Sequence, residues 1–223
     1  MILVVKQVLS SEELARVRAA LVGARFGDGR ESAGAVAREQ KHVLQLDRAG
    51  DSQREVGELV ARALLRHPQV QAAALPKSVR HPTINRYEPG MYYGPHLDAA
   101  ILRGVAAMRA DVSVSVFLSD ASDYGGGELV VESGHAPVAI KADAGDAVLY
   151  PSGSIHQVKA IESGVRLVAV TWLQSLVRDP EQRRQLYELS ETIALLQAQG
   201  AHSETLLRLR ATYDNLTRMW AEV

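Results

Sequence analysis

Apolar residues recur at helical spacing in the first third of the chain. Ser10 and Glu13 stand three residues apart at the start of one such run, the arrangement of a capping box at a helix N-terminus. A second run predicts a helix over residues 51–66, and its apolar face comprises Val56, Leu59, Val60 and Ala63. Pro68 suits the first position of a short third helix that ends near residue 75.

Two other features complete this segment. Residues 1–8 predict an edge strand, and the polar, Gly-rich residues 27–34 predict a loop. We therefore expect residues 1–78 to form a mainly helical segment that packs on a core built by the rest of the chain.

The pattern changes to short strands over residues 79–176. Residues 112–116 alternate strictly between Val and Ser and then continue into Phe117 and Leu118. Shorter apolar runs predict further strands at residues 128–131, 138–140, 147–150, 156–161 and 165–173. Turn signals separate the runs at residues 123–127, 132–134, 143–146, 151–153 and 162–164. Many short strands at regular spacing favour a closed or double-sheet architecture, so we expect a jelly-roll domain here.

Residues 177–223 return to helical spacing. Asp179 suits an N-cap, Pro180 suits the first helical position, and Gly200 is expected to end this helix before a second one starts near Ser203. The apolar stripes of the two helices are Leu186, Leu189, Ile193 and Leu196, and then Leu206, Leu209, Tyr213, Leu216 and Trp220. The stripes predict a C-terminal helical hairpin packed on itself or on the core, and a homodimer contact along part of the seam is the alternative. The predicted fold class is α+β.

Composition and charge narrow the class of protein. Hydrophobic residues make up 47% and charged residues 23% of the 223 residues, as in ordinary soluble globular proteins. A formal net charge of −1, with no run of Lys and Arg, argues against nucleic acid as a partner. The apolar stretch at residues 1–5 is too short for a signal peptide or a membrane span. We expect a cytoplasmic protein with no membrane attachment, and without cysteine it has no disulfides.

Three residues have the spacing of a metal site. His96 and Asp98 are two residues apart, so on a strand both side chains point to the same face. His156 opens a different predicted strand, and a jelly roll can bring that strand beside the first. Two imidazoles and one carboxylate form the facial triad of non-haem Fe(II) oxygenases, which leaves positions open for a co-substrate and O₂. We predict that these three residues hold Fe(II) and form the catalytic centre. The other histidines are expected to be structural or exposed: His42, His67, His81, His135 and His202.

Arg166 follows His156 by ten residues and makes the prediction more specific. With a turn at residues 162–164, a hairpin places Arg166 opposite Ala160 and on the same face as His156. The two side chains are then roughly 13 Å apart along the strand. A guanidinium binds a carboxylate in a bidentate fork, so Arg166 can hold the far carboxylate of 2-oxoglutarate while its other end chelates the metal. A surface ion pair is the alternative for this arginine.

Segments spread along the chain resemble one family. They are residues 85–90 (NRYEPG), 93–98 (YGPHLD), 117–120 (FLSD), 124–129 (YGGGEL), 145–152 (GDAVLYPS), 172–179 (WLQSLVRD) and 215–220 (NLTRMW). In these segments the sequence resembles the bacterial PKHD-type hydroxylases, which are Fe(II)/2-oxoglutarate dioxygenases similar to prolyl 4-hydroxylases. The resemblance runs through nearly the whole chain.

The resemblance implies a double-stranded β-helix (jelly-roll) core with helices packed on it. It implies that the three metal-site residues bind Fe(II), that Arg166 anchors 2-oxoglutarate, and that L-ascorbate keeps the iron ferrous. Tyr87 stands where prolyl-hydroxylase-like enzymes often place a tyrosine facing the co-substrate; a half-buried strand tyrosine is the alternative. Gly125-Gly-Gly127 either permits close approach of a substrate or forms a tight turn. Tyr92 and Tyr93 are candidates for the mouth of the pocket.

The predicted function is an Fe(II)/2-oxoglutarate-dependent dioxygenase that hydroxylates an unidentified substrate and releases succinate and CO₂. Whether that substrate is a peptide or a small molecule stays open at this point. One alternative is a non-catalytic sensor of iron, O₂ or 2-oxoglutarate on the same fold. Another is a cupin-like metal-binding protein in which Arg166 is structural.

Overall fold

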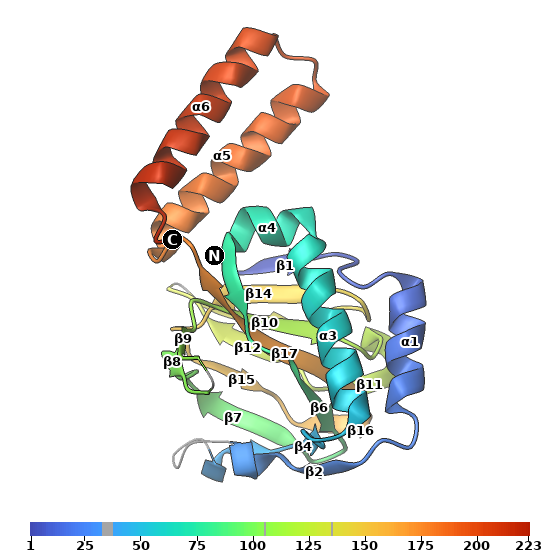
Figure 1. Ribbon diagram of the computed structural model, residues 1–223. Coiled ribbons are helices and arrows are strands. Elements are labelled where there is room, and N and C mark those ends of the chain that lie inside the picture. Colours follow the sequence, from blue (N-terminus) through green and yellow to red (C-terminus); the bar gives the residue numbers. More distant parts are fainter. Residues whose placement is uncertain (33–37, 105, 135) are drawn as a thin grey trace.

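Two antiparallel β-sheets face each other in the computed structural model, which describes residues 1–32, 38–104, 106–134 and 136–223 (Figure 1). Within these residues the major sheet has eight strands and the minor sheet has five. The order in the major sheet is β1 (Leu3–Val5), β14 (Ala147–Pro151), β10 (Val112–Phe117), β17 (Arg166–Ser175), β6 (Thr83–Tyr87), β4 (Leu44–Leu46) and β2 (Phe26–Asp28), with β5 (Pro76–Val79) also paired to β17. The order in the minor sheet is β13 (Pro137–Ile140), β12 (Leu129–Glu132), β15 (His156–Val158), β7 (Tyr92–His96) and β3 (Lys41–His42). This double sheet confirms the predicted jelly-roll core.

Helices cover the outer face of the major sheet (Figure 1). They are α1 (Ser11–Leu21), α3 (Asp51–Arg66) and α4 (Pro68–Ala74). One apolar core lies between these helices and the sheet, where Val56 and Val60 pack in a cluster with Val114. A second apolar core lies between the two sheets and includes Tyr87 and Phe117. The major sheet is therefore covered on both faces.

The coverage on both faces explains the Val–Ser alternation of β10. All six of its residues are buried. Val112, Val114 and Val116 belong to the core under the helices, while Ser113 and Ser115 line a cavity between the sheets. The polar face of this strand thus meets the interior of the sandwich instead of bulk water.

The N-terminal segment supplies strands that its sequence pattern does not predict. The capping box of Ser10 and Glu13 and the helix over residues 51–66 are confirmed, and β1 is an edge strand of the major sheet. The predicted loop at residues 27–34 is wrong at its start, because Phe26–Asp28 is strand β2 and Gly29–Ser32 is a 3₁₀ turn; residues 33 and 34 lie outside the described residues. The division into segments 1–78, 79–176 and 177–223 stays a prediction.

Two Gly-containing segments expected to be turns pair with each other as strands. They are β11 (Tyr124–Gly126) and β16 (Ile161–Gly164), with a bulge between Gly125 and Gly126. A Cβ on Gly164, where φ is +73°, would lie 2.0 Å from the Asp123 carbonyl oxygen, so glycine permits this close approach of two backbones. The predicted strand over residues 156–161 correspondingly ends at Val158. No hairpin joins His156 to Arg166, and that prediction is wrong.

The C-terminal helical hairpin projects away from the sandwich (Figure 1). It consists of α5 (Pro180–Ala198) and α6 (Ser203–Trp220), and the Asp179 side chain caps α5 as predicted by accepting from two backbone N–H groups. The base of the hairpin is tied to the core, since the Glu222 N–H donates to the Leu176 carbonyl and Arg109 pairs with the Glu222 carboxylate. A short pair of strands, β8 (Ile101–Leu102) and β9 (Met108–Arg109), lies at one end of the sandwich. None of the described helices is long and apolar enough to cross a membrane.

Candidate metal centre and co-substrate pocket

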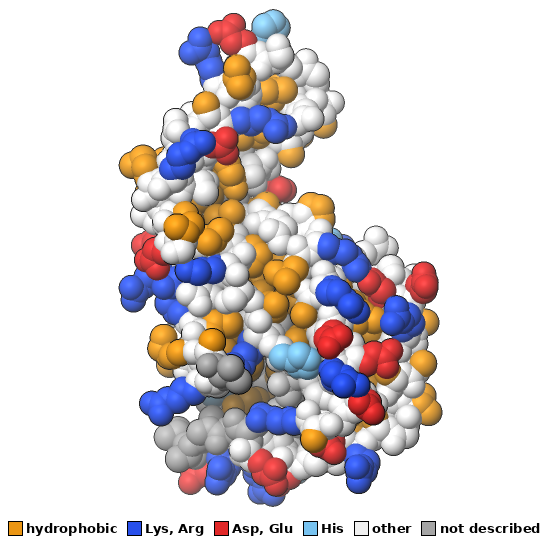
Figure 2. Space-filling view, viewed as in Figure 1, with side chains coloured by type: hydrophobic (Ala, Val, Ile, Leu, Met, Phe, Trp, Pro, Cys, Tyr) orange, Lys and Arg blue, Asp and Glu red, His pale blue; other side chains and the backbone are white. Residues whose placement is uncertain are grey.

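A cavity of about 1360 Å³ lies between the two sheets. Its wall includes all five candidate residues of the sequence analysis: Tyr87, His96, Asp98, His156 and Arg166. In the space-filling view, a recess with Lys and Arg side chains on its rim lies in the lower half of the molecule (Figure 2). The sandwich therefore brings residues that are up to 79 positions apart into the wall of one cavity.

Neighbouring strands of the minor sheet position the three candidate metal ligands. His96 ends β7 and His156 opens β15, and the two residues stand directly opposite each other in the antiparallel register. Asp98 lies just beyond the end of β7, not on the strand, and its Oδ2 is 3.7 Å from His156 Nε2. One ligand atom from each residue lies within 4.8 Å of the other two. This spacing allows one ion to contact all three.

Backbone carbonyls orient both imidazoles. His96 Nδ1 lies 2.8 Å from the Gly94 oxygen, and His156 Nδ1 lies 3.0 Å from the Ser154 oxygen. Because a carbonyl can only accept, each Nδ1 carries the proton and each Nε2 keeps a free lone pair for a metal. Burial and the neighbouring His156 also lower the pKa of His96 to about 4, so the imidazole is neutral at pH 7, as a ligand must be.

Two serines that the sequence analysis missed support the carboxylate. Ser113 Oγ lies 2.6 Å from Asp98 Oδ2 and 2.8 Å from Ser152 Oγ. Since the Ser113 hydroxyl has one proton and the carboxylate can only accept, Ser113 donates to Asp98 and accepts from Ser152. The polar alternation of β10 was the available signal, but the same alternation is typical of a strand with one face in water.

Arg166 is a buried cation without an anion. Its side chain is 1% exposed, and its Nε and one terminal nitrogen have no hydrogen-bond partner among the described residues. It stands opposite Tyr87 in the register of β17 and β6, and its Cζ lies 5.2 Å from the Tyr87 ring and 5.1 Å from the Phe117 ring. The surface ion pair considered above is wrong. Arg166 and His156 belong to opposite sheets, and both line the cavity.

The three candidate tyrosines differ in position. Tyr87 is fully buried in the cavity wall, and burial raises its pKa to about 12. Tyr93 also lines the cavity and stacks on His96 with ring centroids 3.6 Å apart. Tyr92 is exposed and contacts His42 edge to face outside the cavity wall.

The glycines and the remaining histidines complete the comparison with the sequence. A Cβ on Gly127 would lie 3.2 Å from Arg166 Cδ, so the absent side chain leaves room for the arginine. His81 is exposed and lines the cavity, which the sequence did not indicate. His42 and His202 are exposed and His67 is half-buried, while His135 lies outside the described residues.

The fold and the site together define a 2OG-Fe(II) oxygenase. The family model described as "2OG-Fe(II) oxygenase superfamily" matches residues 82–174, and that described as "PKHD-type hydroxylase C-terminal domain" matches residues 181–222. A PKHD-type hydroxylase of Hyphomonas neptunium is 45% identical over 226 residues, and one of Stenotrophomonas maltophilia is 40% identical over 225; both alignments cover 100% of each chain. The chain belongs to the PKHD-type hydroxylases, a family of Fe(II)- and 2-oxoglutarate-dependent hydroxylases.

Solved structures share the fold at low sequence identity. A prolyl hydroxylase of Trichoplax adhaerens, in complex with a hypoxia inducible factor peptide fragment, has a TM-score of 0.57 at 17% identity and covers 83% of this chain and 86% of its own. HygX of Streptomyces hygroscopicus, with nickel, 2-oxoglutarate and hygromycin B bound, has a TM-score of 0.52 at 15% identity and covers 79% and 84%. This similarity confirms the architecture.

Proposed function

We propose that this chain hydroxylates its substrate with Fe(II) held by His96, Asp98 and His156 and with 2-oxoglutarate anchored by Arg166. Two donors of the Arg166 guanidinium have no partner among the described residues, and this side chain lies in the wall of the same cavity as the triad; this observation carries the proposal. A buried cation is costly unless an anion pairs with it, and the distal carboxylate of 2-oxoglutarate is such an anion. The all-nitrogen-and-oxygen donor set of the triad suits Fe(II).

The protein's own residues bind, orient and exclude water. The two backbone carbonyls fix the imidazole tautomers, and Ser113 holds the Asp98 carboxylate in place. The rings of Tyr87 and Phe117 pack beside the Arg166 guanidinium, and Tyr87 also lines the cavity. We assign Tyr87 to the co-substrate pocket on this basis. Bound iron, 2-oxoglutarate and O₂ would supply the oxidising power for hydroxylation, with release of succinate and CO₂.

Anaerobic titration of the Fe(II)-loaded protein with 2-oxoglutarate tests the assignment. The weak visible charge-transfer band of the chelate is expected in the wild type. It should be absent in Asp98→Ala, which loses a metal ligand, and unchanged in Asp214→Ala, which removes an exposed carboxylate of α6. Full turnover and retained iron in Asp98→Ala would refute the proposed ligand set.

The sensor hypothesis uses the same residues and differs in one observable. A hydroxylase releases more succinate when its substrate is added, whereas a sensor stays at the uncoupled background with every compound. Family membership favours the hydroxylase. On this fold, the Trichoplax protein binds a peptide fragment and HygX binds hygromycin B, so the architecture is compatible with either kind of substrate.

Other expectations stay predictions. A dependence on L-ascorbate would appear as loss of activity over repeated turnovers without it. A homodimer through the C-terminal hairpin would be measured by light scattering; Leu195, Leu207 and Met219 are exposed apolar side chains there. A cytoplasmic location and the lack of a nucleic-acid partner can be checked by fractionation and by gel shift.

A further inference from the structure

The cavity wall contains positively charged side chains in addition to Arg166, which the proposed function already uses. The other charged side chains in its wall are Lys41, Arg48, Arg80 and Arg103, with no carboxylate among them in the described part of the chain. The whole chain has 25 Lys and Arg against 26 Asp and Glu, so this set is a local concentration and does not follow from composition.

The co-substrate does not require these four cations. Two positive charges on Fe(II) and one on Arg166 are balanced by the Asp98 carboxylate and the two carboxylates of 2-oxoglutarate. The occupied centre is therefore neutral without any contribution from the remaining cations. The charge of Arg48, Arg80 and Arg103 is therefore left for another ligand.

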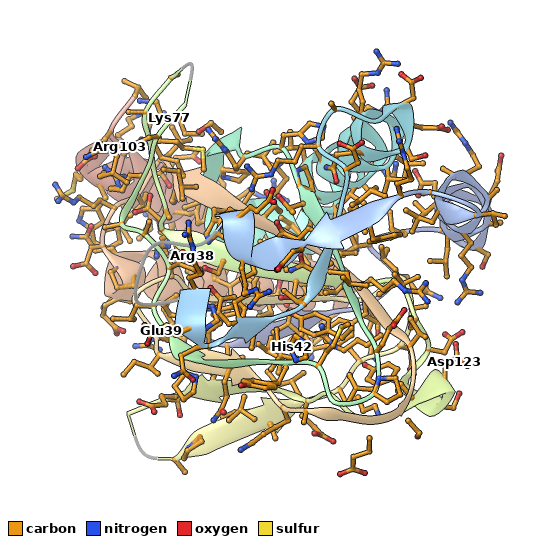
Figure 3. The ribbon with its side chains drawn as sticks, turned by 90° about the horizontal axis from the view of Figure 1, so that it is seen from below. Arg38, Glu39, His42, Lys77, Arg103 and Asp123 are labelled. Carbon is orange, nitrogen blue, oxygen red and sulfur yellow. The ribbon has the colours of Figure 1, made fainter. Side chains whose placement is uncertain are left out.

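Three of the cations lack an anionic partner among the described residues. Arg48 and Arg103 are exposed and form no ion pair there. Arg80 is half-buried, and its guanidinium donates to the Arg103 carbonyl at 2.9 Å, which fixes the segment that carries Arg103 at the rim. Figure 3 shows Arg103 on the same side of the molecule as Lys77, Arg38 and Glu39, with Asp123 on the opposite side.

Two other side chains in the wall also favour a negatively charged ligand. Trp172 lines the cavity, and its buried indole N–H, which can only donate, has no partner among the described residues. Burial and the nearby Arg48 lower the pKa of Lys41 to about 8, as expected in a region of positive potential. Among the described residues of the wall, positively charged and other hydrogen-bond donors face only one carboxylate, that of Asp98.

Apolar surface and volume indicate the size of the ligand. Leu97 and Ile101 line the cavity although they are 55% and 53% exposed. Pockets that enclose a small molecule usually measure about 300–1000 Å³. The cavity, at about 1360 Å³, has room for 2-oxoglutarate and a second small molecule together.

We propose that the substrate is a small organic anion, with a carboxylate or phosphate group bound by Arg48, Arg80 and Arg103 and an apolar body against Leu97 and Ile101. The inference rests on the proposed function, because it takes the cavity as the active site. It adds the chemical class of the substrate and the residues that select it.

Calorimetry with three small probes tests this inference on the full chain, loaded anaerobically with Fe(II) and 2-oxoglutarate. The probes are phenyl phosphate, phenylsuccinate and the uncharged phenylsuccinamide. The test variant is Arg48→Glu/Arg103→Glu, which spares the loop contact of Arg80. The matched control is Arg62→Glu, an exposed arginine of α3 outside the cavity wall. A hexaglutamate peptide is a fourth probe.

At least one small anion should bind the wild type and Arg62→Glu with the same Kd. Its Kd for Arg48→Glu/Arg103→Glu should be higher by about tenfold or more. The uncharged probe should bind none of them measurably. Which anion binds more tightly distinguishes phosphate from carboxylate. Equal binding to all three proteins, or binding of hexaglutamate alone, would overturn the inference.

A repeat without iron and 2-oxoglutarate separates the two proposals. In that state Arg166→Ala should leave anion binding by Arg48, Arg80 and Arg103 (the rim site) intact. The reason is that Arg166 is assigned to 2-oxoglutarate and not to the substrate anion. Rim binding without a charge-transfer band would mean that the proposed function fails while the anion site stands. A normal band without rim binding would mean the reverse.

Discussion

Arg166→Met should change co-substrate binding and protein stability in opposite directions. Removing one partner of a buried, bidentate charge pair costs about 3 kcal/mol or more, which is at least about a 100-fold increase in Kd. In the unliganded protein the substitution removes two orphaned donors, each of which costs about 1–3 kcal/mol. It also removes two cation–π contacts worth about 0.5–2 kcal/mol each. The methionine fills similar space against both rings, so the free energy of unfolding should stay within about 1 kcal/mol of wild type or rise.

The assay pairs an anaerobic 2-oxoglutarate titration with urea unfolding of the metal-free protein. Arg183→Met is the matched control, since Arg183 is also buried but its guanidinium donates to the Val177 and Arg178 carbonyls. That variant should lose about 2 kcal/mol or more of stability and keep its 2-oxoglutarate affinity. Unchanged co-substrate affinity in Arg166→Met, together with a stability loss like that of the control, would refute the reasoning. Arg166 would then be a structural residue.

Three further substitutions test the support of the site and the fold. Ser113→Ala removes the donor to Asp98 and should weaken Fe(II) binding about 10- to 100-fold in a chelator competition. Glu13→Gln removes the partner of Arg66, which holds the pKa of Glu13 at about 2, below its ordinary 4.5. A lowered carboxyl pKa stabilises fully above the unfolded-state value and progressively less below it. The variant should therefore be less stable by about 1 kcal/mol at pH 7, and the difference should vanish as the pH falls from 4.5 towards 2. Gly164→Ala forces a Cβ into a backbone oxygen and should lower the free energy of unfolding by about 2 kcal/mol or more.

Each of these substitutions has a neighbour that serves as its control. Ser115→Ala alters the same strand without touching Asp98 and should keep the iron affinity. Glu12→Gln changes an exposed carboxylate of the same helix and should show no such pH dependence. Gly153→Ala adds a Cβ in open space and should leave stability nearly unchanged. If a control variant changed as much as its test variant, the contact removed in the test variant would not explain the effect.

The candidate metal triad could be predicted from the sequence because its chemistry is carried by residue type. Two histidines and an aspartate are recognisable as metal ligands by their side chains, although Asp98 lies just beyond the end of β7 and not on the strand as expected. The position of Arg166 was predicted for a wrong structural reason. Its partner strands are β10 and β6, and the Gly-containing segment taken for a hairpin turn pairs with β11 instead. Pairing between distant segments leaves no mark in local periodicity.

The N-terminal strands and the hydrogen bond from Ser113 to Asp98 could not be predicted from local sequence patterns for a related reason. Strands of two or three residues, such as β2, β3 and β4, are too short to establish a period. The hydrogen bond from Ser113 to Asp98 depends on which sheet face is enclosed, and the Val–Ser alternation is the same for an enclosed face and a wet one. These features follow from tertiary packing.

The strands within residues 26–46 determine which fragments of this enzyme can be expressed without exposed strand edges. They cover the edges of β6 in the major sheet and β7 in the minor sheet, and β1 covers β14. A fragment limited to the oxygenase match at residues 82–174 would leave these edges bare, and also the part of β17 that pairs with β5; each bare edge is a template for aggregation. Chimaeras that exchange the catalytic region between relatives should therefore carry the N-terminal strands along with it, because the first 46 residues close the barrel that they precede.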